Sequence, residues 1–306
     1  MAKVLVCVAW PYANSPIHLG HVAGSLLPPD LYSRYRRLRG DEVLMVSGSD
    51  QHGTPITVRA EKEGTTPLEV AERYHEINKK AIEGLDIEFS LFTKTHTENH
   101  FRVVSEVFLE LLKKGYLYEK STLQYFCPSC DKFLPDRYVE GACPSCGNEK
   151  ARGDQCEKCG KTFEGGELIE AKCVHCATVP ELRETKHHFI RLSEFQEQLI
   201  DWIKDKEHWR PSVQLFTQNW LEAGLEDRPI TRDMEWGIPV PLPGQEGKVI
   251  YVWFDAVIGY LSASKEWAQL SGGPDAWKAY WTDPAVRSYY FLGKDNIPFH
   301  TIIWPA

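Results

Sequence analysis

The sequence predicts an α/β fold built on a doubly wound parallel sheet. Residues 4–9 form a short, continuous run of apolar, β-rich side chains, which is typical of a strand buried on both faces of a parallel sheet. A helical pattern follows over residues 18–39, and a second strand-like run covers residues 42–47. Strands that alternate with helices through short loops favour right-handed crossovers, which produce a parallel sheet with helices on both faces.

The first predicted helix contains two adjacent prolines, Pro28 and Pro29. Because proline removes a backbone donor and its ring crowds the preceding turn, we expect a kink or a split into two helices. Gly40 then ends this helix. The second strand is followed by a polar loop over residues 48–55.

The next predicted helix begins with a complete set of N-terminal capping residues. Thr66 offers an N-cap, Pro67 fits the first helical turn, and Glu69 provides a capping-box carboxylate. These residues predict a helix that continues to about residue 83. Another helical pattern covers residues 98–114 and completes the first half of the α/β domain.

The amino-acid composition of the chain changes at about residue 116. Residues 116–186 are rich in cysteine, glycine and proline and show only short strand-like runs, which indicates an insert. Two helical patterns follow, over residues 194–206 and 213–222. The insert is therefore expected to separate two halves of one α/β domain.

Two further strand-then-helix units form the expected second half. Residues 249–253 lead into a helix over 255–270, and residues 288–292 lead into a helix over 296–304. The predicted organisation is a first half-domain at 1–115, an insert at 116–228 and a second half-domain at 229–306.

Composition limits the class of protein. The 306 residues are 42% hydrophobic and 25% charged, which is enough apolar surface for a core and argues against disorder. The formal net charge is -8, so any contact with nucleic acid must be a local patch. No apolar run approaches the roughly 18–20 residues that span a bilayer, and no signal-peptide pattern follows Met1. We expect a cytoplasmic protein.

Nine cysteines are present, and eight of them form four Cys-x-x-Cys pairs in the insert. In a chain without a secretion signal this pattern indicates metal ligands, with disulfides and iron–sulfur clusters as weaker alternatives. Two pairs complete one tetrahedral zinc site, so we expect two structural zinc sites. Spacing leaves three pairings open, including a nested one that joins the two inner pairs and the two outer pairs. The predicted ligands are Cys127, Cys130, Cys143, Cys146, Cys156, Cys159, Cys173 and Cys176. Cys7, on the first strand, is expected to be a core thiol.

The loop after the first strand has the features of a phosphate site. The carboxyl end of a strand and the amino end of the next helix present free N–H groups to a ligand. Gly20 lets a nucleotide approach the backbone, and His18 and His21 lie three residues apart on one helical face. Their imidazoles could donate to a phosphoryl group as charge develops. No Gly-x-Gly-x-x-Gly or Gly-Lys-Ser/Thr motif occurs, which disfavours ordinary dehydrogenases and P-loop enzymes.

These residues carry a family resemblance. His18-Leu-Gly-His21 resembles the HIGH motif of class I aminoacyl-tRNA synthetases, and the wider match is similar to the methionyl-tRNA synthetase family, in particular to archaeal-type members with doubled zinc knuckles. The resemblance runs nearly end to end. The matching blocks are residues 11–14, 49–55, 134–137, 231–233, 236–239, 251–260, 293–295 and 299–300.

The resemblance implies a Rossmann-like catalytic domain with an inserted zinc-knuckle connective domain. It implies the ligase reaction in which ATP, as its Mg²⁺ complex, and L-methionine form methionyl-adenylate, before the aminoacyl group passes to tRNA(Met). His18, His21 and Arg232 are the implied catalytic residues. The implied ATP-binding residues are His18, Gly20, His21, Gly293 and Asp295.

An aromatic pocket for methionine is also implied. Asp50 would hold the ammonium group, since a buried cation needs a charge partner. The family commonly has leucine where Trp10 stands and isoleucine where Asn296 stands, so the pocket shape should differ in detail. The implied methionine-binding residues are Ala9, Trp10, Tyr12, Asp50, Trp253, Ala256, Val257, Tyr260, Asn296 and His300.

The sequence contains no Lys-Met-Ser-Lys-Ser loop. The resemblance places that loop and a helical anticodon-binding domain beyond Ala306, so we expect a fragment that lacks full activity. The insert is the expected contact for the acceptor end of tRNA. Two alternatives are another class I aminoacyl-tRNA synthetase and a non-catalytic zinc-ribbon scaffold that binds nucleic acid.

Overall fold

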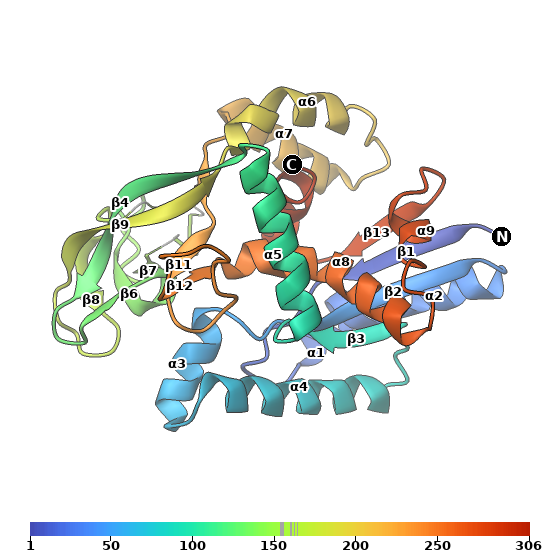
Figure 1. Cartoon of the computed structure of the whole chain (residues 1–306), viewed down its shortest axis with the longest axis horizontal. Helices are drawn as coiled ribbons and strands as arrows, with labels where there is room; N and C mark the ends of the chain where they lie inside the picture. The colour runs from blue at the N-terminus through green and yellow to red at the C-terminus, as the bar shows by residue number, and fades with distance from the viewer. Residues whose placement is uncertain (154–155, 160, 162, 164) are drawn as a thin grey trace.

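The computed structural model describes residues 1–153, 156–159, 161, 163 and 165–306. A four-stranded parallel sheet forms its centre, in the order β13-β1-β2-β3 (Figure 1). This confirms the predicted parallel sheet. The four strands are β1 (Lys3–Val8), β2 (Glu42–Ser49), β3 (Leu91–Lys94) and β13 (Arg287–Phe291).

Helices cover both faces of this sheet. Alternate side chains of β1 point to opposite sides: Val4, Val6 and Val8 join one buried apolar cluster, whereas Leu5 and Cys7 join another. The first cluster packs under α2 and α4, and the second packs under α8 and α9. The doubly wound arrangement is therefore confirmed, and Cys7 is a core thiol. These helices are α2 (Leu27–Leu38), α4 (Pro67–Gly84), α8 (Val252–Leu270) and α9 (Lys278–Trp281).

The helix predicted over residues 18–39 is split, as its prolines indicate. A short α1 (Leu19–His21) passes through a π-helical turn (Val22–Leu26) before α2 begins, with Pro28 and Pro29 in the first turn of α2. The capping box of α4 is also confirmed, because Thr66 accepts from the Glu69 N–H and Glu69 accepts from the Thr66 N–H. The fifth helix, α5 (Glu98–Lys113), lies along α8.

Three elements differ from the predictions. A helix, α3 (Thr54–Glu63), follows the loop after β2, although Thr54 and Pro55 suggest only a loop. The strand expected at 249–253 is β12 (Lys248–Ile250), which pairs antiparallel with β11 (Thr231–Asp233) outside the parallel sheet. Its Val249 and Ile250 side chains are buried, and Ile250 belongs to an apolar cluster that includes Ile190 and Leu192. In place of a helix over 296–304, a 3₁₀ turn (Lys294–Asn296) and a π-helical turn (Phe299–Ile303) occur around Pro298.

The insert is built on a long antiparallel hairpin of β4 (Leu117–Cys127) and β9 (Glu181–Ile190). Figure 1 shows this hairpin reaching away from the parallel sheet and carrying β6 to β8 at its far end. Among the described residues, no helix is both long and apolar enough to cross a membrane. The other strands and helices within the predicted insert are β5 (Lys132–Phe133), β6 (Val139–Ala142), β7 (Ala151–Arg152), β8 (Ile169–Cys173), α6 (Gln196–Ile203) and α7 (Pro211–Ala223), and β10 (Arg228–Pro229) lies at its predicted boundary.

Candidate functional site

A cavity of about 630 Å³ lies at the carboxyl ends of three parallel strands. β1, β2 and β13 end just before the lining residues Ala9, Asp50 and Leu292, respectively. This is the edge at which open parallel sheets bind ligands, and the volume suits a nucleotide or an amino acid conjugate. The lining comprises Ala9, Trp10, Pro11, Tyr12, His18, Gly20, His21, Gly24, Ser25, Asp50, Trp253, Ala256, Val257, Tyr260, Leu292, Gly293, Asp295, Asn296 and His300.

Every residue predicted for ATP or the amino acid lines this cavity. Their roles remain predictions, but the fold places all of them around the same cavity. Four lining residues were missed by the sequence analysis, namely Pro11, Gly24, Ser25 and Leu292. Each of these four residues lies within a few positions of a predicted site residue. Their place in the sequence, beside the blocks that match the family, could therefore have indicated them.

Two histidines line the cavity. His18 is the N-cap of α1: its Nδ1 accepts from the Gly20 N–H at 3.0 Å, and its own N–H donates to His21 Nδ1 at 3.2 Å. The two imidazole rings lie 3.9 Å apart between centroids. Because each Nδ1 accepts a backbone N–H, each Nε2 carries the ring proton and can donate to an anion. Burial and the neighbouring His18 lower the pKa of His21, which favours this neutral form.

Another part of the cavity lining is aromatic. The Trp253 ring stacks on Phe299 at 4.6 Å and meets the Tyr12 ring edge-on at 6.2 Å. His300 donates from Nδ1 to the Asn296 carbonyl, so its Nε2 accepts from the Tyr260 hydroxyl, both at 2.8 Å. Burial lowers the pKa of His300 to about 4, and its ring is therefore neutral. Such a wall suits an apolar or thioether side chain.

One carboxylate lies in this wall. Asp50 is 4% exposed, and its Oδ1 accepts from the His52 N–H at 3.1 Å. Burial raises the pKa of Asp50 well above its usual value, and the charge of Asp255 raises the pKa further. A ligand cation would restore the ionised form, because an opposite charge nearby favours a carboxylate.

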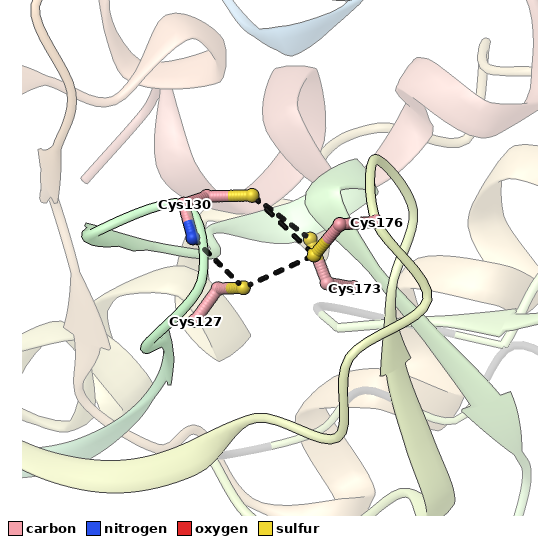
Figure 2. A group of neighbouring side chains, drawn as sticks. All are labelled: Cys127, Cys130, Cys173 and Cys176. Atoms are coloured by element: carbon pink, nitrogen blue, oxygen red, sulfur yellow. Dashed lines mark hydrogen bonds between the residues drawn. The ribbon is translucent and has the colours of Figure 1, made fainter.

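Eight cysteines form two four-sulfur groups (Figure 2 shows one of them). Cys127 and Cys130 meet Cys173 and Cys176, with sulfur separations of 3.4–3.9 Å. Four sulfurs around one zinc lie about 3.8 Å apart when each bond is about 2.3 Å, so this outer group fits the ion. None of these eight described cysteines forms a disulfide. The inner group is Cys143, Cys146, Cys156 and Cys159, with separations of 3.6 and 3.8 Å.

The two groups resolve the pairing that spacing left open. The outer pairs share one site and the inner pairs share the other, which is the nested arrangement. The outer group also contacts α3 through the residues around it. Tyr138 donates to Thr57 at 2.7 Å, and both His175 and Lys132 pair with Glu61, at 2.9 and 3.0 Å. The metal site is thus tied to the helix that follows Asp50.

A family model described as class I tRNA synthetases (M) matches residues 4–306. The chain belongs to this family. It is 59% identical over 304 residues to a methionine–tRNA ligase of Dehalococcoides mccartyi strain CBDB1, covering 99% of this chain and 55% of the relative. A methionine–tRNA ligase of Thermoplasma acidophilum is 50% identical, with 99% and 56% covered. The chain therefore spans about half the length of these relatives.

The fold also matches a solved member of the family. The structure titled "Mycobacterium tuberculosis methionyl-tRNA synthetase in complex with methionyl-adenylate" aligns with a TM-score of 0.73 at 24% sequence identity. The alignment covers 100% of this chain and 54% of the other. At this identity the likeness shows the class I synthetase fold of the sheet and its helices.

Trp10, which stands where the resemblance leads us to expect leucine, packs into space left by two glycines. A Cβ at Gly48 would lie 2.3 Å from the Trp10 ring, and a Cβ at Gly259 would lie 2.9 Å from it. The indole therefore occupies space that two glycines leave open between β2 and α8. Asn296, the second departure, also lines the cavity.

Of the residues predicted for catalysis, ATP or methionine, Arg232 alone does not line the main cavity. Its guanidinium lies 3.8 Å from the centre of the Tyr251 ring and donates to the carbonyls of Pro229 and Thr231. It lines a much smaller cavity beside Gly53. β11 holds it there because Thr231 and Asp233 point to the other side, where they bind His187.

Gly20→Ala is expected to weaken nucleotide binding by about fivefold or more. The new Cβ would lie 2.8 Å from His18 Cε1, so the imidazole must leave its cap position on the Gly20 N–H. Losing one N-cap costs about 1 kcal/mol, which is about fivefold. Calorimetric titration with a non-hydrolysable ATP analogue measures the effect. Gly84→Ala, where the added Cβ meets nothing within 4 Å, is the matched control and should bind like the parent.

Proposed function

We propose that this chain activates L-methionine with ATP, forming methionyl-adenylate and pyrophosphate, as the catalytic part of a methionine–tRNA ligase. The observation that carries the proposal is that one cavity is lined by His18 and His21 as well as by Asp50 and the aromatic side chains. Relatives at 50–59% identity named methionine–tRNA ligase support the same substrate. The aminoacyl group would then pass to tRNA(Met).

At the nucleotide end, ATP would lie over Gly20, Gly293 and Asp295, with its phosphates toward His18 and His21. The methionine carboxylate attacks the α-phosphorus, and pyrophosphate leaves. Imidazole N–H groups fixed before the reaction stabilise the charge that develops on the phosphoryl oxygens. The Mg²⁺ that accompanies ATP would neutralise part of the phosphate charge.

At the amino-acid end, Asp50 would bind the ammonium group and the aromatic wall would bind the thioether. Trp253, Tyr260 and His300 are already fixed by stacking and hydrogen bonds, so little ordering is needed on binding. The remaining contacts would come from Ala9, Trp10, Tyr12, Ala256, Val257 and Asn296. Arg232 would support adenylate formation after leaving the Tyr251 ring.

The insert would organise the rest of the enzyme. We assign residues 116–228 to a connective domain between catalytic halves at 1–115 and 229–306, with zinc in both four-cysteine groups. Closed four-cysteine sites have no open coordination position, so these ions stabilise structure and take no part in the reaction. The connective domain would meet the acceptor end of tRNA, and the enzyme would work in the cytoplasm.

Calorimetric titration of the purified chain with methionine, isoleucine and a non-hydrolysable methionyl-adenylate analogue tests this function. We expect methionine and the analogue to bind and isoleucine not to bind, with about two zinc ions per chain on the same sample. Tighter binding of isoleucine would indicate another class I synthetase. No binding of any of the three, beside full zinc content, would favour a zinc-ribbon scaffold.

A further inference from the structure

One face of α4 contacts the chain segments beside both Asp50 and His18. Three polar side chains of this helix recur at every third position, Glu72, His75 and Asn78, and the last two are buried. Residues three apart are neighbours on a helix surface, so these side chains form one polar row. The proposed reaction uses none of the three. Each of them is hydrogen-bonded to a residue within three positions of Asp50 or His18.

Asn78 holds the loop that leads to His18. Its side chain is 0% exposed, its Oδ1 accepts from the Ile17 N–H at 2.8 Å, and its Nδ2 donates to the Ser15 carbonyl at 3.3 Å. A donor on one side and an acceptor on the other fix which way the amide points. Ser15 and Pro16 are exposed. A buried side chain of a regular helix therefore fixes an exposed stretch of backbone just before His18.

Gln51 is hydrogen-bonded at all four of its polar groups, and it is fully buried. Its backbone N–H donates to Thr95 Oγ1 at 2.9 Å, and its carbonyl accepts from Trp236 Nε1 at 2.7 Å. Its side-chain Nε2 donates to Glu72 Oε1 at 3.1 Å, and its Oε1 accepts from the His96 N–H at 3.3 Å. A buried residue bonded in this way cannot shift without leaving polar groups unpaired.

Asp50 is therefore attached to α4 on both sides. The residue after it, Gln51, reaches the helix through Glu72. The residue before it, Ser49, has its hydroxyl oxygen 3.0 Å from His75 Nδ1. Two consecutive turns of one helix thus fix the backbone from which the Asp50 carboxylate projects into the cavity.

The loop before His18 has two separate attachments. Its first part is bound to Asp50, whose N–H donates to the Pro11 carbonyl at 2.9 Å and whose carbonyl accepts from the Ala13 N–H at 2.7 Å. Its second part is bound to Asn78. Loss of the Asn78 bonds should therefore release the residues just before His18 without releasing Asp50.

A helix is a rigid spacer between these attachments. At 1.5 Å per residue, the six positions from Glu72 to Asn78 span about 9 Å. Because small displacements of positioning groups slow a reaction strongly, a fixed separation matters. We propose that Asn78 and Gln51 are positioning residues that fix two segments to α4: Asn78 places His18 for the nucleotide, and Gln51 places Asp50 for the amino-acid ammonium group. The inference rests on the proposed function for its two ligands.

Asn78→Leu tests the nucleotide side. Leucine has the branched shape of asparagine without its polar atoms, so both bonds to the loop are lost. Affinity for a non-hydrolysable ATP analogue, measured by calorimetry, should fall by about tenfold, which corresponds to about 1.4 kcal/mol. Affinity for free L-methionine should stay within about twofold of the parent value.

Gln51→Met should give the opposite pattern. This change keeps the length of an unbranched side chain and removes the bonds to Glu72 and the His96 N–H. We expect the affinity for free L-methionine to fall by about tenfold and that for the ATP analogue to stay within about twofold. Equal losses of both ligands in either variant would overturn the proposal, because α4 would then be a general support. Unchanged affinities in both variants would overturn it as well.

Hydrogen exchange gives a second readout that needs no ligand. In Asn78→Leu the Ile17 amide loses its acceptor, so exchange should rise over residues 14–22 and stay unchanged over residues 49–53. Gln51→Met should show the reverse. Unchanged exchange in both segments would overturn the proposal. If the parent binds neither ligand, the proposed function fails, whereas the exchange profiles still decide whether α4 fixes the two segments.

Thr66→Ala is the matched control. It weakens α4 by removing its N-cap but leaves the polar row in place. Both affinities, and exchange in both segments, should match the parent. If Asn78→Leu or Gln51→Met fails to fold, Asn78→Ala and Gln51→Ala remove the same bonds without adding volume, and the same crossed pattern is expected of them.

Discussion

Replacing Cys173 and Cys176 by serine is expected to remove one zinc ion and unfold the part of the insert around the outer four-cysteine group. Four of the ten described buried residues in the local apolar cluster are zinc-site cysteines, Cys127, Cys143, Cys156 and Cys173. Too little apolar surface remains to hold β8 and the turn after β4 without the outer zinc ion. Structural zinc contributes roughly 10–16 kcal/mol of apparent binding free energy in small zinc domains, which is far more than this cluster can replace.

Zinc content and limited proteolysis measure this effect. We expect about one zinc per chain in the double variant in place of about two, and new cleavage sites within residues 127–178. Cys7→Ala is the control, because Cys7 is a buried cysteine of β1 that belongs to neither group, and it should keep both ions. Two retained zinc ions in the double variant would show that the outer group is not a metal site.

The central sheet could be predicted because its strands have a recognisable local sequence pattern. Residues 4–9 and 288–292 are short apolar runs flanked by polar turns, and both became parallel strands of one sheet. The strand near residue 250 has the same local signature but pairs with β11. Periodicity reports burial, and it cannot say which neighbour provides the hydrogen bonds.

The sequence predicted which residues line the cavity, but it predicted their arrangement in space only in part. The matching blocks follow strands that end at the same edge of the sheet, so their side chains converge. Arg232 lies on β11, whose direction depends on contacts with the distant β9, and it points to another cavity. The nested cysteine pairing likewise depends on the β4–β9 hairpin, which brings residues 127 and 176 together across 49 positions.

The buried polar network behind Asp50 could not be predicted from the sequence. His52, His100 and Asp255 lie on three different elements, and each one alone resembles an ordinary polar residue of a loop or helix. Only the packing of α5 against α8 shows that they share one buried space. Long-range contacts of this kind depend on the tertiary fold and have no local pattern.

Asp50→Asn is expected to lower methionine affinity by about 30-fold or more. Removing one partner of a buried charge pair costs about 2 kcal/mol at least, which is about 30-fold. The fold should survive, because the asparagine carbonyl can still accept from the His52 N–H. Burial raises the pKa of Asp50, so methionine affinity of the parent should fall as pH drops through that pKa, whereas the variant should show no such fall.

A ligand without the ammonium group separates this charge effect from a general loss of the pocket. 4-(Methylthio)butanoate keeps the thioether and the carboxylate, so it should bind the parent and Asp50→Asn with equal affinity. Asp30→Asn is the control, since Asp30 is also a buried carboxylate but pairs with Arg34 outside the cavity. If Asp50→Asn weakened both ligands equally, Asp50 would shape the pocket without binding the ammonium group, and methionine would have to be held by its carboxylate and side chain alone.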